Sequence, residues 1–306
     1  PYNDGLTIET TIDSKAQQRL YDIVNTNDYI QYVNEKIQNA VVMLDTKTGA
    51  VRAVNGGRKQ TTLLGYNRAT DNTRSTGSTI KPVIDYGPAI EYLNYSTGQT
   101  IMDQRTTYSN GVELNNWDFS HKGAMTLRTA LVYSRNTTAL QTFKAVGETN
   151  IKSFLNNLDI QIKNDGQDYL VESNSIGADI SPIKMAAAYA TFGNYGTYSK
   201  PYTVRKVTTR DGQVTEFKPE QKQAMKDSTA YMITDVLKDS FKYGFATQAA
   251  IPGLPTAAKT GSSNYTVEQK RAMGASDYED IIPDSWFIGY STDYTISAWT
   301  GYDNPY

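Results

Sequence analysis

Ser78 and Lys81 are the pair of residues in this sequence that could most directly perform chemistry. Residues three apart share one face of a helix, so the Lys81 amine can reach towards the Ser78 oxygen. Pro82 is tolerated only in the first turn of a helix, so we expect the helix to begin at or just after Ser78. The hydroxyl would then lie near the free N–H groups and the positive end of the helix dipole. A serine with an amine base in reach is an arrangement for nucleophilic catalysis. The alternative is a helix-capping Ser78 and a solvated Lys81.

Two further motifs follow in order, Ser134-Arg135-Asn136 and Lys259-Thr260-Gly261. S-x-x-K, S-x-N and K-T-G occur together in serine acyl-transfer enzymes that react with β-lactams. Each motif alone is weak, and the chain contains other matches: Ser181 to Lys184, Ser262 to Asn264, and Lys47-Thr48-Gly49. The last of these lies in a predicted hairpin tip ahead of every candidate serine, and Ser181 has a sufficient function as a helix cap before Pro182. Only the set at 78, 134 and 259 keeps the order helix start, loop between helices, strand.

The composition excludes several other kinds of site. The 306 residues contain no Cys and one His, His121, and carry a formal net charge of −2. Thiolate nucleophiles, disulfides and Cys-based zinc sites are therefore absent, and no G-x-S-x-G sequence supplies a serine for a triad with His121. We expect His121 to be a surface or packing residue, and we expect no metal and no cofactor. The charge gives no reason to expect nucleic-acid binding, and no apolar run is long enough for a membrane span.

The predicted elements place these motifs between two β-rich ends of the chain. Residues 6–12 alternate as a strand, and two β runs, 41–44 and 51–54, flank a Gly-containing turn. From 79 to about 200 the pattern is mostly helical, and a strand pair at 204–208 and 214–217 precedes a helix that should end near Gly244. The last strands are expected at 257–261, 286–290 and 295–299, with a long polar loop from 262 to 284 that resembles a functional rim. The arrangement predicts one sheet made from both chain ends, with helices inserted between them.

Capping residues predict where several helices begin. Ser14 with Gln17 forms a capping-box pattern for the first helix. Further helices are expected over 126–134 and 138–146, and from Thr149 to Leu158. Ser181 with Pro182 starts another helix. Asp227 or Ser228 is expected to cap a long amphipathic helix thereafter.

With these motifs in this order, the chain closely resembles the transpeptidase domain of class A (bifunctional) penicillin-binding proteins of Gram-positive type. The resemblance covers essentially all residues and is carried by Thr10 to Asp13, the hairpin 41–57, and the segments Arg74 to Pro82, Asn116-Trp117-Asp118, Ser134 to Thr137, 185–196 and Lys259 to Tyr265. It implies an α+β fold, with a five-stranded antiparallel sheet covered by helices and an all-helical lobe. It also implies an interdomain or linker segment at 1–38 and a transpeptidase domain at 39–306. A glycosyltransferase domain and a membrane anchor would lie upstream in the longer protein, at the outer face of the cytoplasmic membrane. The abrupt start at Pro1 agrees with that expectation.

The resemblance also implies roles for the motif residues. Ser78 would attack the penultimate D-Ala carbonyl of a D-Ala-D-Ala peptide end in peptidoglycan stem peptides, and β-lactams would acylate the same oxygen. Lys81 would be the base, provided that burial, the helix end and Lys259 lower its pKa. Ser134 would relay a proton to the leaving nitrogen, and Asn136 would hold Lys81 and the substrate amide.

The remaining implied roles concern substrate binding. Lys259 would hold the catalytic hydroxyls and the substrate carboxylate, and Thr260 and Ser262 would hydrogen-bond that carboxylate. Gly261 would leave room for substrate backbone to lie along the strand. The oxyanion hole would consist of the backbone N–H groups of Ser78 and Ser262.

Three alternatives stay open. A class A β-lactamase would add an E-x-x-x-N motif between Asn136 and Lys259, yet none of the glutamates there has Asn four residues later: Glu148, Glu172, Glu216 and Glu220. A D,D-carboxypeptidase would use water as the acceptor, and only the class A resemblance favours a transpeptidase. A penicillin-sensing module would be acylated without turning over peptide.

Overall fold

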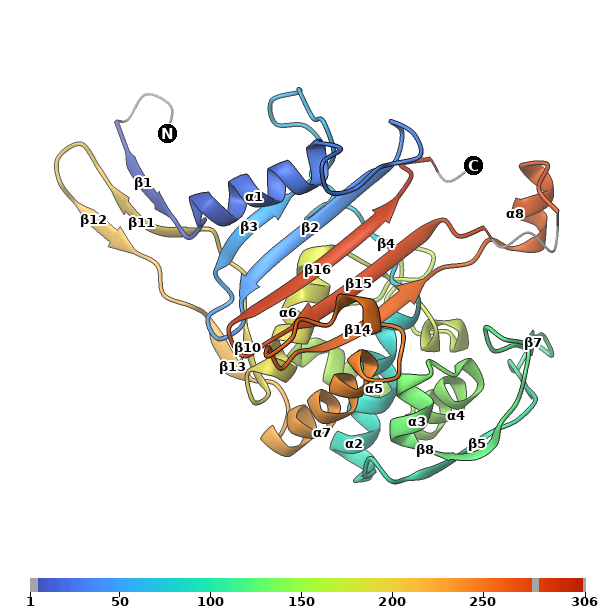
Figure 1. The fold of residues 1–306 in the computed structure, drawn as a ribbon. Helices are drawn as coiled ribbons and strands as arrows, with labels where there is room; N and C mark the ends of the chain where they lie inside the picture. Colours follow the sequence, from blue (N-terminus) through green and yellow to red (C-terminus); the bar gives the residue numbers. More distant parts are fainter. Residues whose placement is uncertain (1–4, 277–280, 305–306) are drawn as a thin grey trace.

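One five-stranded antiparallel sheet forms the centre of the molecule, in the order β14-β15-β16-β2-β3 (Figure 1). The computed structural model describes residues 5–276 and 281–304. The strands are β2 (Gln38–Asp45), β3 (Val51–Asn55), β14 (Ala257–Ser262), β15 (Asp284–Tyr290) and β16 (Tyr294–Gly301). The sheet therefore combines strands from the two ends of the chain, which confirms the fold expected from the sequence.

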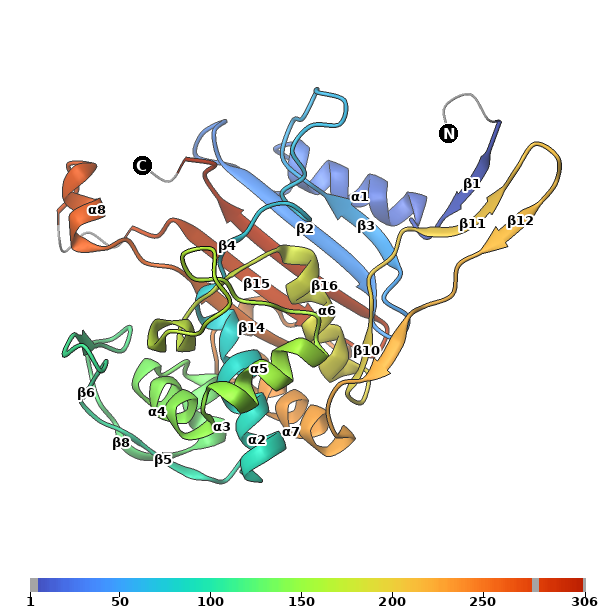
Figure 2. The same cartoon turned by 180° about the vertical axis from the view of Figure 1, so that it is seen from behind.

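Alternating apolar side chains anchor the sheet. In β2, Val42 and Leu44 are fully buried, and Trp299 on β16 is one of the largest fully buried side chains. The turn between β2 and β3 contains Gly49 at φ +74°, a left-handed conformation that favours glycine. Helix α6 (Pro182–Gly193) packs on β2, β15 and β16 and is seen in front of the sheet in Figure 2. Helix α1 (Ser14–Asn25) packs on β3.

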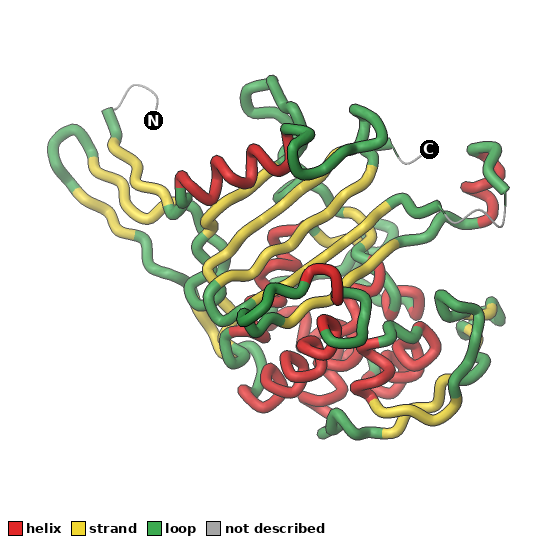
Figure 3. Tube along the Cα trace, viewed as in Figure 1, coloured by secondary structure: helices red, strands yellow, loops and turns green. Residues whose placement is uncertain are grey.

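Five further helices gather on one side of the sheet, next to β14, and form a helical lobe (Figure 3). They are α2 (Gly87–Leu93), α3 (Leu127–Val132), α4 (Asn136–Val146), α5 (Glu148–Asn157) and α7 (Asp227–Lys238). Ile84, Leu127, Leu131 and Phe154 are fully buried within one core that continues to the sheet. Burying such side chains contributes about 1.5–3 kcal/mol each, so this core holds lobe and sheet together.

A smaller three-stranded sheet extends away from this core (Figure 1). It consists of β1 (Thr7–Thr10), β11 (Val204–Thr208) and β12 (Val214–Glu216), all antiparallel. All three predicted strands are present: β11 has the predicted bounds, whereas β1 and β12 are shorter than predicted. This sheet shares no strand with the central one.

The structure corrects two predicted helix caps and confirms the predicted start of α6 at Pro182. Asp13, and not the Ser14–Gln17 pair, caps α1, because its Oδ1 accepts hydrogen bonds from the backbone N–H groups of Lys15 and Ala16 at 2.9 Å. The N-cap of α7 is Lys226, which leaves Asp227 as the first helical residue. Ser181 occupies the N-cap position of α6, but its side chain makes no capping hydrogen bond. Several neighbouring polar residues suit the N-cap position, and the backbone conformation ahead of the helix decides which of them occupies it.

The segment between α2 and α3 was predicted as helical but contains short strands. β5 (Thr100–Asp103) pairs with β8 (Gly123–Thr126), and β6 (Thr106–Thr107) pairs with β7 (Glu113–Leu114). Strands of two to four residues are too short to show a sequence period. Other short strands are β4 (Arg74–Ser75), β9 (Asp179–Ile180), β10 (Thr197–Ser199) and β13 (Gln221–Gln223).

The predicted loop from 262 to 284 contains a helix, α8 (Val267–Ala272). Thr266 and Gln269 form a capping box at its start. Residues 277–280 of this loop lie outside the described residues. The rim function proposed for the loop stays a prediction.

Candidate active site

The helical segment that carries Ser78 is less regular than the sequence predicts. A 3₁₀ turn, η1 (Gly77–Ile80), comes first, followed after Lys81 by a wide π turn, η2 (Pro82–Tyr86), and then by α2. The N–H of Gly87 donates to the carbonyl of Pro82, five residues earlier. Such π turns inside helices frequently mark functional sites. Ser78 is half-buried and Lys81 is fully buried, so the hydroxyl is more accessible than the amine.

Two glycines allow η1 to lie directly against β14. A Cβ added to Gly77 would come within 2.2 Å of the Ser262 carbonyl oxygen, and one added to Gly261 within 2.7 Å of Thr79 N. Gly77 also has φ +50°. The missing side chain of Gly261 is therefore required by packing inside the protein, a reason different from the substrate path expected from the sequence. The close contact brings the backbone of Ser262 beside the start of η1, next to Ser78.

Lys81 is held by the Ser134-Arg135-Asn136 tripeptide between α3 and α4. Its Nζ donates to Ser134 O and Asn136 Oδ1, both at 2.7 Å, and has longer contacts of 3.3 Å to Ser134 Oγ and Arg135 O. Ser134 has φ +54°, a strained conformation for a residue with a side chain. The tripeptide therefore turns its carbonyl groups towards Lys81 at some conformational cost.

Lys259 completes the contact between the three motifs. Its Nζ lies 2.9 Å from Ser134 Oγ and 2.9 Å from the carbonyl oxygen of Thr260. The Ser134 hydroxyl consequently lies between two amines, those of Lys81 and Lys259. In the described part of the chain, the Ser78 hydroxyl makes no hydrogen bond, so the direct Lys81–Ser78 contact expected from the sequence is not formed here.

Burial lowers the pKa of both lysines. Burial is the main cause for Lys81, and the charges of Lys259 and Arg135 lower its pKa further, to well below the ordinary lysine value. Burial alone lowers the pKa of Lys259 to about 7. Two ammonium ions held by one hydroxyl repel each other, so protonation of one lysine disfavours protonation of the other. The pKa of Lys81 is lowered more than the pKa of Lys259, so Lys81 loses its proton more readily.

Asp85 is a buried carboxyl one turn after Lys81. Its side chain is fully buried, and neither oxygen has a hydrogen-bond partner among the described residues. Burial raises the pKa of Asp85 well above the ordinary range, and the charge of Lys81 opposes this effect. An ionised Asp85 would raise the pKa of Lys81, so burial of Asp85, which favours its neutral form, weakens this opposition to a neutral Lys81.

The predicted carboxylate-binding residues Thr260 and Ser262 lie on β14, at the edge of the central sheet, whereas the two predicted oxyanion groups come from Ser262 and from Ser78 on η1. Ser262 is exposed and Thr260 is half-buried, so neither is sealed within the core. The structure thus brings all eight predicted site residues into one region. Sequence reasoning missed Asp85 and Asp103, since neither belongs to a motif and only burial distinguishes them.

His121 is exposed, and its Nδ1 lies 3.7 Å from Asp103 Oδ1. Within residues 5–276 and 281–304, no group of three His, Asp or Glu side chains could hold a metal ion. In the same ranges, no helix has the length and apolar composition needed to cross a bilayer.

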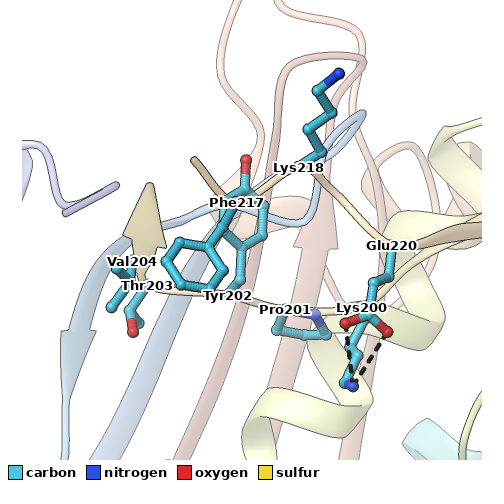
Figure 4. A pocket seen from close by; sticks show the side chains of 8 residues that line it. All are labelled: Lys200, Pro201, Tyr202, Thr203, Val204, Phe217, Lys218 and Glu220. Atoms are coloured by element: carbon cyan, nitrogen blue, oxygen red, sulfur yellow. Dashed lines mark hydrogen bonds and ion pairs between the residues drawn. The ribbon is translucent and has the colours of Figure 1, made fainter. Parts of the chain in front are cut away.

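A hollow of about 300 Å³ lies elsewhere, at the base of the three-stranded sheet (Figure 4). Tyr202 and Phe217 line it together with the Lys200–Glu220 ion pair. It contains no nucleophile with a base in reach. We therefore locate the active site by the meeting of the three motifs and not by this hollow.

A buried lysine pair around the Ser134 hydroxyl, beside the half-buried Ser78 on a helical turn that packs against β14, is an arrangement suited to serine acyl transfer without histidine. Residues 39–304 match the penicillin binding protein transpeptidase domain. The chain therefore belongs to the family of penicillin-binding protein transpeptidase domains, as the motifs predicted.

Individual relatives agree with this assignment. The chain is 42% identical to penicillin-binding protein 1A/1B of Bacillus subtilis (strain 168), over 98% of this chain and 33% of that protein. It is 40% identical to penicillin-binding protein 1A of Streptococcus oralis, over 98% of this chain and 48% of that protein. The chain thus spans a third to a half of the length of these relatives. The fold is similar to that of the penicillin-binding protein PonA1 from Mycobacterium tuberculosis, with a TM-score of 0.85 at 23% identity over 99% of this chain and 78% of that one.

Proposed function

We propose that this chain is a serine-type D,D-transpeptidase domain that cross-links peptidoglycan stem peptides through an acyl-enzyme on Ser78. The observation that carries the proposal is the Lys81–Ser134–Lys259 arrangement beside the half-buried Ser78. The family membership supports the class of reaction. The D-Ala-D-Ala donor, the amine acceptor and β-lactam inhibition are parts of the proposal.

In the first step, Ser78 Oγ attacks the penultimate D-Ala carbonyl while Lys81 accepts its proton. A neutral lysine has two N–H groups and one lone pair. The two 2.7 Å contacts, to Ser134 O and Asn136 Oδ1, use both N–H groups and leave the lone pair for the serine proton. The backbone N–H groups of Ser78 and Ser262 would stabilise the oxyanion that forms on the carbonyl.

Collapse of the tetrahedral intermediate breaks the C–N bond and releases the terminal D-Ala. The leaving nitrogen needs a proton, which Lys81 can return through the Ser134 hydroxyl, because Ser134 Oγ lies 3.3 Å from Lys81 Nζ. Lys259 would donate to the same oxygen and attract the substrate carboxylate, with hydrogen bonds from Thr260 and Ser262. In the second half-reaction, the acceptor amine attacks the ester carbonyl and loses a proton to Lys81. The C–O bond to Ser78 then breaks, and Lys81 returns the proton to Ser78 Oγ.

The domain division and the cellular setting also belong to this proposal. We assign 39–306 to the transpeptidase domain and 1–38 to a linker that docks through α1 on β3. We further propose that a glycosyltransferase domain and a membrane anchor belong to the full-length protein, which would place this domain at the outer face of the cytoplasmic membrane; the supporting observation is that the relatives are longer than this chain.

The test is intact mass after mixing with a penicillin, followed over hours, with Ser78→Ala as the control. We expect one stable drug adduct that the variant does not form. Rapid return to the free mass with hydrolysed drug would instead mean a β-lactamase. Incubation with a D-Ala-D-Ala peptide, with and without an amine acceptor, separates a transpeptidase from a carboxypeptidase by the product formed, and an acylated protein without any product would be a sensing module.

A further inference from the structure

Asp103 ends β5, outside every recognised motif, and its side chain accepts four hydrogen bonds near the site. Its carboxylate is fully buried. Oδ1 accepts from Asn116 Nδ2 at 2.8 Å and from Thr137 Oγ1 at 2.6 Å, and Oδ2 accepts from Arg135 Nε and the N–H of Lys122, both at 2.9 Å. A buried carboxylate with this many donors stays ionised, and these donors keep the pKa of Asp103 low although burial opposes them.

The bond to Arg135 fixes the middle of the tripeptide that holds Lys81. The Arg135 side chain is buried and contacts Asp103, Asp118 at 3.0 Å and the carbonyl of Ser120. Since the guanidinium group presents its donors in a rigid fork, these partners leave Arg135 little freedom to rotate. Its own carbonyl is one of the oxygens around Lys81.

The bond to Asn116 fixes the end of the tripeptide. Asn116 donates to Asp103 through Nδ2, and its Oδ1 accepts from the backbone N–H of Asn136 at 2.7 Å. The amide of Asn116 is thus oriented by Asp103 and in turn holds Asn136, whose Oδ1 binds Lys81. Two separate chains of contacts therefore run from Asp103 to Lys81, one through Arg135 and the other through Asn116 and Asn136.

We propose that Asp103 is a positioning residue for acylation: it locks Ser134-Arg135-Asn136 in its strained form and so directs the oxygens that hold Lys81. This inference rests on the proposed function, in which Lys81 is the base for Ser78. The left-handed Ser134 needs such support, because strained backbone persists only where its surroundings over-determine it. A carboxylate can serve all four donors at once because it only accepts hydrogen bonds.

The test is Asp103→Asn, which keeps the size of the side chain but replaces one acceptor oxygen by a donor. Stopped-flow mixing with a fluorescent penicillin separates the binding constant of the first complex from the acylation rate constant. We expect the acylation rate constant to fall about 10–100-fold with the binding constant unchanged, since misplacement by about 1 Å can cost a hundredfold. The matched control is Asp118→Asn, which removes the other carboxylate from Arg135 but no contact to Asn116 or Thr137. It should stay within about threefold of the parent protein, as for a partly exposed ion pair.

Two outcomes would overturn the inference: a folded Asp103→Asn protein with an unchanged acylation rate constant, or an equal loss in Asp118→Asn. Thermal unfolding checks the fold of each variant. If Asp103→Asn does not fold, Thr137→Val removes a single donor to the carboxylate and should slow acylation about threefold. An unchanged rate in that variant would also reject the inference. Failure of the proposed function is recognised separately, because the parent protein would then form no adduct on Ser78.

Discussion

Two polar regions of this molecule use charge in opposite ways. At the catalytic junction, where η1, the Ser134 tripeptide and β14 meet, Lys81 and Lys259 are buried and each contacts several fixed oxygens. In the three-stranded sheet β1–β11–β12, Glu9 pairs with Arg205 and Lys206 on an exposed surface. Water screens the second set, so its charges remain ordinary ions. At the junction, burial removes that screening and lowers the pKa values of both lysines. The Lys81 amine can therefore be neutral and act as a base.

The largest expected effect is the loss of acylation in Lys81→Met. Methionine has a similar length and no base, so the Ser78 proton has no acceptor. We expect the acylation rate constant to fall about 10²–10⁴-fold, the range for removing a general base. Stopped-flow acylation by a penicillin measures it. A rate near that of the parent protein would mean that another group takes the proton and that burial of Lys81 has no catalytic purpose.

The next effect concerns packing at the junction. Gly261→Ala places a Cβ at 2.7 Å from Thr79 N, so η1 and β14 must separate. We expect the free energy of unfolding to fall by about 1–3 kcal/mol, as in other overpacked sites, and acylation to slow. Urea denaturation measures the first effect. Gly98→Ala is the control, because only Ser96 Oγ lies near that position, at 3.7 Å. Equal stability of the two variants would contradict the tight contact.

The pH dependence of acylation tests the coupling of the two lysines. The charge of Lys259 lowers the pKa of Lys81, so removing it in Lys259→Met should raise that pKa. Lys81 is active when neutral. The acidic limb of the pH profile, where the acylation rate constant rises with pH, should therefore move to higher pH. Lys259→Arg keeps a positive charge and should leave the limb in place, even if the rate falls. A limb that does not move in Lys259→Met would show that the lysines act independently.

A smaller effect is expected where the three-stranded sheet joins the central one. Thr11 is buried, and its Oγ1 donates to Val51 O at 2.7 Å and lies 3.1 Å from Tyr202 O. Thr11→Val should lower the free energy of unfolding by about 1 kcal/mol, the net value of a buried hydrogen bond. Acylation should be unchanged, because Thr11 contacts none of the site residues. Slower acylation at equal stability would mean that this region communicates with the site.

The smallest effect is expected for Glu9→Gln. Hydrogen bonds from Lys206 and Arg205 lower the pKa of Glu9, yet the carboxylate is solvent-exposed. We expect the urea midpoint and the acylation rate to equal those of the parent protein at physiological salt. A clear loss of stability, persisting in high salt, would remove the contrast between the two regions.

Much of the architecture was predictable from sequence. The β2–β3 hairpin follows from two β runs around a turn ending at Gly49, and the C-terminal strands follow from short apolar runs such as Trp286 to Tyr290. Their pairing into one sheet was predicted from the resemblance and the strand count. The short strands around Asp103 were not predicted, because two to four polar residues carry no period. The helix cap at Asp13 was also missed, because Ser14 and Gln17 suit a helix start equally well on paper.

The sequence by itself determined the chemical inventory: a serine three residues before a lysine, two further motifs in the right order, no cysteine and a single histidine. These facts follow from residue types and spacing, which are local properties of the chain. Only the tertiary structure decided that the Lys81 amine binds the Ser134 carbonyl and makes no hydrogen bond to Ser78, and that Gly261 serves the packing of η1. It alone revealed that Asp103 supports the tripeptide. Burial and contacts between distant residues depend on how the sheet and the helical lobe pack, and they set pKa values and orientations that no spacing can specify.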